Sequence, residues 1–63
     1  MTSYEAYVYC RDVKDTKEIR RLITYSYHAY LYCKHFKDRK SMRKLITDDA
    51  LIDELDNIKE KYV

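Results

Sequence analysis

Glycine, proline, glutamine and tryptophan are all missing from the 63 residues, and Asn57 is the only asparagine. Glycine and proline mark most tight turns and strand ends, so their absence argues against a β fold rich in hairpins. Both residues also weaken helices, so a chain without them is well suited to helix formation. The sequence therefore predicts an all-α fold.

The chain has no apolar run long enough to cross a membrane. Charged residues interrupt its first segment, where a secretory signal peptide would need an apolar stretch. We therefore expect a cytoplasmic protein with no membrane partner, in the host cytoplasm if the chain is viral. Its two cysteines, Cys10 and Cys33, are then expected to be reduced and buried.

A chain of 63 residues has little interior with which to stabilise itself. A domain of this size buries only about 60% of the surface that its unfolded chain exposes. Such small proteins gain stability from disulfides, a metal or a second copy. Because two cysteines allow at most one internal disulfide, we predict that the chain forms a homodimer.

Hydrophobic periodicity predicts one long central helix over 16–38, with Asp15 or Thr16 as its N-cap. Its apolar face follows spacings of three and four and consists of Ile19, Leu22, Ile23, Ser26, Ala29, Tyr30, Cys33 and Phe36. Segment 1–14 is predicted to be a short helix or an extended arm. If it were a strand paired across the dimer, the layout would approach that of ribbon-helix-helix DNA-binding proteins.

The second half of the chain predicts two further elements. Residues 41–46 are expected to form a short helix or a bend, and residues 48–62 a C-terminal helix. The resulting fold is one domain over 1–63, a helical hairpin with an N-terminal extension that doubles into a four-helix bundle as a homodimer. No internal repeat is expected from this pattern.

A ridge of polar and aromatic side chains is predicted beside the apolar face of the 16–38 helix. On a helix its members fall within roughly 80° of one another, and they are Arg21, Tyr25, His28, Tyr32, His35 and Arg39. Tyrosine and arginine are favoured at the centres of protein interfaces, so the ridge is a candidate partner-binding surface. The alternative is that the two tyrosines form the edge of a wide core and the histidines are half exposed.

A basic run follows, and it is a candidate nucleic-acid-binding segment because cations there could bind phosphates. The run consists of Lys34, Lys37, Arg39, Lys40, Arg43 and Lys44. Two alternatives are a solvated charged face and pairing with the acidic last helix, either of the same chain or of a partner.

The sequence lacks the motifs of known catalytic and metal sites. It has no glycine-rich phosphate loop and no Cys-x-x-Cys motif. Cys10, His28, Cys33 and His35 lack the close pairs that a structural zinc site requires. We therefore expect no metal, no cofactor and no enzymatic activity.

These observations favour a small interaction protein, phage- or virus-like in its brevity, which dimerises and binds another protein through the ridge in an adaptor-like, inhibitor-like or other regulatory role. The alternative is a dimeric nucleic-acid-binding protein that uses the basic run from 34 to 44.

Overall fold

The computed structural model describes residues 1–61, and the side chains of residues 1–58. These residues form five helices and no strand. The helices are α1 (Ser3–Asp12), α2 (Lys17–Arg20), α3 (Ser26–His35), α4 (Lys40–Arg43) and α5 (Asp49–Lys61). The all-α prediction is thus confirmed. Within the described residues, none of these helices is long and apolar enough to span a membrane.

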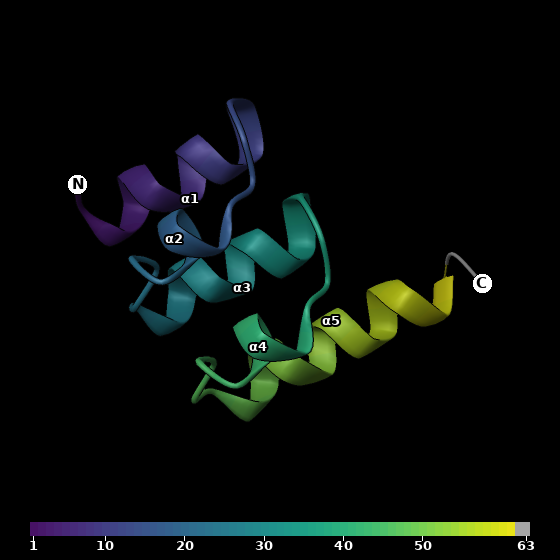
Figure 1. Ribbon diagram of the computed structural model, residues 1–63. Helices are drawn as coiled ribbons and strands as arrows, with labels where there is room; N and C mark the ends of the chain where they lie inside the picture. The colour runs from purple at the N-terminus through teal and green to yellow at the C-terminus, as the bar shows by residue number, and fades with distance from the viewer. Residues whose placement is uncertain (62–63) are drawn as a thin grey trace.

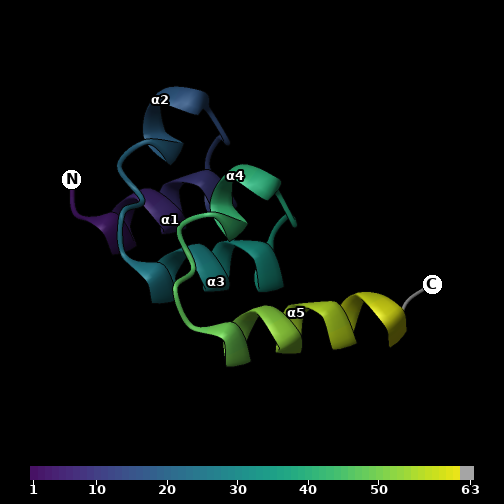
Figure 2. The same ribbon diagram turned by 90° about the horizontal axis from the view of Figure 1, so that it is seen from below.

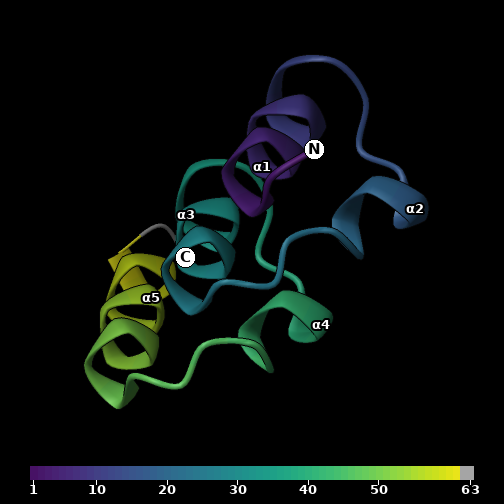
Figure 3. The same cartoon turned by 90° about the vertical axis from the view of Figure 1, so that its left-hand side faces the viewer.

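The helices form two layers. The long helices α1, α3 and α5 lie side by side and run in the same direction, while the short helices α2 and α4 form a second row (Figures 1, 2 and 3). Helix α1 packs against α2 and α3, and α3 packs in the same way against α4 and α5. Each short helix returns the chain so that the next long helix can start at the same end. This is the plan of an α-solenoid, in which each repeat contacts its neighbours.

The sequence contains the corresponding repeat, with a period of 23 residues. Segment 3–24 aligns without gaps on segment 26–47, and the shared residues include the motif Ala-Tyr-x-Tyr-Cys of the long helices and Leu-Ile-Thr after the short ones. The expectation of no internal repeat is therefore wrong. The spacing of apolar residues within one helix does not reveal this period, because each repeat of 23 residues spans a long helix, a short helix and their connections.

Equivalent hydrogen bonds hold the two repeats in the same conformation. The hydroxyl of Ser3 accepts from the backbone N–H groups of Thr24 and Tyr25 at 3.1 and 3.2 Å. One repeat later, the hydroxyl of Ser26 accepts from the backbone N–H of Thr47 at 3.0 Å. Each bond ties the start of one long helix to the connection that leads into the next.

The prediction of one helix over 16–38 is wrong, because the chain leaves the helix after α2 and starts α3 at Ser26. Thr16 caps α2, as expected for one of the two candidates, by accepting from the backbone N–H of Ile19. The break lies where the backbone donates to Ser3, a residue on another helix. Ile23 in the break is only 1% exposed, so tertiary packing overrides the helical periodicity there.

The other predicted elements agree better with the structure. Segment 1–14 contains a helix, and Thr2 and Glu5 form a capping box at its start. Helix α4 lies where a short helix or bend was expected over 41–46. Helix α5 matches the predicted 48–62 helix, of which residue 62 lies outside the described residues. The prediction of a helical hairpin is wrong, because the described residues form five helices in two layers and not two long antiparallel helices.

The core occupies the same positions in both repeats. Its members are Ala6, Tyr7, Cys10 and Ile23 in the first repeat and Ala29, Tyr30, Cys33 and Ile46 in the second, with Tyr32, Met42 and Leu55 added. Ala6 and Ala29 are both 0% exposed. Small side chains at these positions let a long helix approach its neighbours closely.

We predict that Ala29→Leu destabilises the protein by about 1–3 kcal/mol, because extra methyl groups in a closely packed interface force neighbouring side chains apart. The measurement is urea unfolding followed by far-ultraviolet circular dichroism. Ala50→Leu is the matched control, since Ala50 is exposed in the first turn of α5 and should change stability by less than about 0.5 kcal/mol. Equal losses in the two variants would contradict the close packing of α3.

Candidate functional site

A polar cluster joins the two repeats between the layers. The carboxylate of Asp15 accepts from the Arg20 guanidinium at 2.7 Å, from the Tyr32 hydroxyl at 2.8 Å and from the Arg39 guanidinium at 3.1 Å. Arg39 also donates to the Tyr32 hydroxyl at 2.9 Å. The side chain of Asp15 is only 13% exposed. The cluster therefore links the connection after α1 with the middle of α3 and the start of α4.

The charges of this cluster shift the pKa of Asp15. Its burial alone would raise the pKa of the carboxyl group, but the hydrogen bonds from Arg20, Tyr32 and Arg39 outweigh burial and lower it. Burial and the Asp15 carboxylate raise the pKa of Tyr32. Asp15 is therefore held ionised, and its partners are fixed around it.

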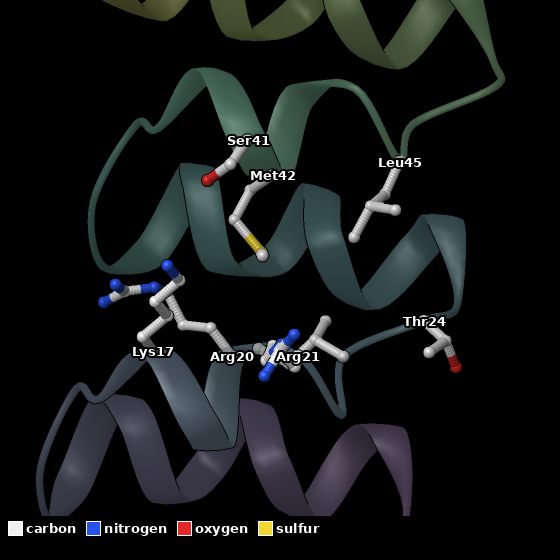
Figure 4. A pocket seen from close by; sticks show the side chains of 8 residues that line it. Lys17, Arg20, Arg21, Thr24, Ser41, Met42 and Leu45 are labelled. Atoms are coloured by element: carbon white, nitrogen blue, oxygen red, sulfur yellow. The ribbon is translucent and has the colours of Figure 1, made fainter.

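A groove lies between the two short helices, next to this cluster. Its volume is about 460 Å³, and it is lined by Lys17, Arg20, Arg21, Ile23, Thr24, Ser41, Met42 and Leu45. Met42 and Leu45 point from the α4 segment toward the α2 segment, where Lys17 and Arg20 lie (Figure 4). The groove thus combines apolar side chains from both repeats with cations from α2 and its C-cap.

The groove lies in the layer of short helices, whose two segments are rich in basic residues and are together called the basic face. The segments 14–21 and 37–44 are equivalent by the 23-residue period, and they contain Lys14, Lys17, Arg20, Arg21, Lys37, Arg39, Lys40, Arg43 and Lys44. Only three acidic residues accompany them, of which Asp15 and Asp38 are bonded to Arg20 and Arg43. Lys17 and Arg21 are exposed and have no carboxylate partner among the described side chains.

The predicted ridge from Arg21 to Arg39 does not form one surface, because its members lie on α3 and in the connections before and after it. Tyr32 and Arg39 belong to the Asp15 cluster. Arg21 lines the groove, and His35 is exposed at the end of α3. Tyr32 is 0% exposed, which agrees with the alternative that the tyrosines of the ridge belong to the core.

The two remaining members of the ridge form a separate aromatic group. Tyr25 is 61% exposed, and its ring centroid lies 5.0 Å from that of His28. The Nδ1 atom of His28 lies 2.9 Å from the hydroxyl of Ser3, and Tyr4 places its ring 5.5 Å away. These contacts hold α1 against α3, so this group is partly structural.

The predicted basic run is also divided. Lys34 pairs with Glu54 at 3.2 Å, and Arg43 pairs with Asp56 at 2.7 Å, so the acidic last helix of the same chain neutralises part of it. Lys37, Lys40 and Lys44 are exposed. The basic side chains that sequence reasoning missed are those of the first repeat, Lys17 and Arg20 among them. The 23-residue period is the signal that would have revealed them.

The described side chains show no other obvious site. Among residues 1–58, no three potential metal-ligating side chains come together. Cys10 and Cys33 are free, buried thiols, and burial raises the pKa of both. Comparison of the chain with models of known protein families, with curated proteins and with solved structures finds no match.

We predict that Asp15→Asn destabilises the protein at neutral pH by about 1–3 kcal/mol, because it weakens charge-assisted hydrogen bonds in a largely buried position. Thermal or urea unfolding would measure this loss. Asp12→Asn is the matched control, since Asp12 pairs with Arg11 at the surface and should have an effect near zero. A similar loss in both variants would show that the cluster has no special role.

We also predict a pH dependence that Asp15 controls. The pKa of Asp15 is lower in the folded chain than in the unfolded chain. Its contribution to the free energy of unfolding is therefore fully present above the unfolded pKa of about 3.9, and it is lost as the pH falls through the folded pKa. The stability difference between the wild type and Asp15→Asn should therefore shrink on acidification below about pH 4. A difference that grows in acid would contradict the assigned direction.

Proposed function

We propose that this chain is a small, non-enzymatic protein-binding module whose α2/α4 groove binds an acidic segment of a partner protein. The observation that carries the proposal is the combination, in one groove, of an apolar floor from Ile23, Met42 and Leu45 with exposed cations at Lys17 and Arg21. An extended or helical segment that carries both carboxylates and apolar side chains matches this combination. An adaptor-like or inhibitor-like role would follow from such binding.

The charge distribution supports an anionic partner. A face on which cations greatly outnumber acids attracts a negatively charged segment and speeds its encounter. Arg20 and Arg43 are held by Asp15 and Asp38, so their guanidinium groups are ordered before binding. Side chains that are already ordered lose less conformational entropy when a partner binds.

Arg21 belongs both to the ridge that the sequence predicted and to this groove, whereas the other ridge residues do not line the groove. Lys40 and Lys44 extend the basic face along the second repeat. The neutralising pairs of Lys34 and Arg43 with α5 leave the α2 side as the more available source of positive charge. The proposed binding surface is therefore centred on α2 and the facing side of α4.

Nucleic-acid binding is the second candidate, and the nine basic residues of the two short-helix segments favour it. Against it, residues 14–24 and 37–47 contain no aromatic residue on which a base could stack. The groove floor is also apolar, which phosphates do not require. An acidic peptide uses both the charge and the apolar floor, so we favour it.

We predict that Lys17→Glu and Arg21→Glu each weaken binding of a labelled peptide of alternating glutamate and leucine by at least about tenfold, a loss of ~1.4 kcal/mol. Fluorescence anisotropy at low and moderate salt is the measurement. The same peptide with glutamine in place of glutamate should bind far more weakly. Lys37→Glu is the matched control, because it changes the net charge equally at an exposed site that does not line the groove.

Labelled duplex DNA and single-stranded RNA are titrated in parallel. Tighter binding of either nucleic acid than of the acidic peptide would favour the second candidate. Equal losses in Lys17→Glu, Arg21→Glu and Lys37→Glu would show that binding follows net charge alone and would contradict a specific groove.

A further inference from the structure

The outer face of α1 carries a second, independent surface. Met1, Tyr4, Glu5, Val8, Tyr9 and Val13 line a shallow hollow of about 400 Å³ along α1, and none of them belongs to the buried residues of that helix, which are Ala6, Tyr7 and Cys10. Met1, Tyr4 and Val13 are 64%, 50% and 67% exposed. The hollow is thus an apolar strip along the full length of one helix.

The internal repeat shows how this strip is covered inside the stack. Tyr9 corresponds to Tyr32 of the next repeat. Tyr32 is 0% exposed because the first repeat covers it, and its hydroxyl is bonded to Asp15 and Arg39. Tyr9 is only partly buried. The face that the first repeat covers on α3 is therefore open on α1, where Tyr4 and Val13 are exposed.

The other end of the stack carries a different surface. Where Tyr30 and Cys33 of α3 meet α5, the equivalent positions of α5 carry Asp53 and Asp56, both exposed. Charged residues at such positions are typical of a terminal helix that closes a repeat stack. Contact between the α1 end of one copy and the α5 end of another would remove these carboxylates from water, which is costly.

We propose that two copies of the chain associate through the outer faces of their α1 helices, around a two-fold axis. The acidic α5 end disfavours a head-to-tail contact, so the pairing joins like ends and closes after two copies. The repeat plan supports this occupant, because stacks of fewer than three repeats are marginally stable. Pairing would join the two short stacks into one, with long helices from both copies.

The charges along α1 select the antiparallel arrangement. Glu5 lies in the first turn, whereas Lys14 lies beyond the last turn, where Arg11 is already paired with Asp12. Antiparallel helices place Glu5 of each copy toward the Lys14 end of the other, and parallel helices would bring the two Glu5 carboxylates together. Val8 then lies near the two-fold axis. The α2/α4 groove lies on the other layer and is left free.

The test is sedimentation equilibrium of the whole chain over a range of concentrations. We expect a reversible transition from 7.8 kDa to twice that mass. Tyr4→Lys should raise the dimer Kd by at least about tenfold, because it places a charge within an apolar contact. Val13→Glu should do the same, because it places a carboxylate in the contact near Glu5 of the other copy, and it leaves the ring contacts that Tyr4 makes with Tyr7 and His28 in place.

Tyr27→Lys is the matched control. Tyr27 is the equivalent of Tyr4 in the second repeat, is also 50% exposed, and makes a similar contact with Tyr30. It should leave the dimer Kd unchanged. Circular dichroism checks that each variant is folded, and if Tyr4→Lys fails to fold, Val13→Glu decides. The proposal would be overturned if the wild-type chain stayed monomeric or formed open-ended oligomers. It would also be overturned if Tyr27→Lys raised the dimer Kd as much as Tyr4→Lys does.

Discussion

The contact between one repeat and the next is the constraint on which the rest of the structure depends. Each long helix carries more apolar surface than its own short helix can cover, so α1 needs α3, and α3 needs α5. The fully buried alanines, Ala6 and Ala29, allow this close approach. The hydroxyls of Ser3 and Ser26 then fix where each connection turns. Burial supplies the favourable free energy, and these hydrogen bonds determine the register.

The same constraint explains the basic face. Because every repeat folds back through a short helix, residues that follow each long helix by a few positions gather in the second layer. Both repeats carry lysine and arginine there, so the layer of short helices contains two basic segments. The Asp15 cluster compensates part of this charge internally. Because Asp15 pairs with both Arg20 and Arg39, these two cations lie close together without an external anion.

The sequence allowed the fold class and several helix positions to be predicted, but not the topology. The absence of glycine and proline indicated helices, and the apolar stripe that includes Leu51 and Leu55 located the last one. The error lay at residues 21–25. There the spacing of Leu22 and Ile23 continues a helical pattern, yet Ile23 is buried against the core while Leu22 is 43% exposed. A hydrogen bond to Ser3, some twenty positions away, decides the conformation, and local spacing contains no information on such a partner.

The exposed acids at the end of the stack have a consequence for how such a protein can grow. Each unit with the Ala-Tyr-x-Tyr-Cys motif packs against the long helix that follows it, whereas α5 carries exposed Asp53 and Asp56 at two of those positions. Duplication of residues 26–48 would therefore insert a repeat between α1 and α5 without creating a new kind of junction. Each insertion would lengthen the row of short helices and the groove between them. Gene duplication would thus change the length of the proposed binding groove, while α5 stays the same.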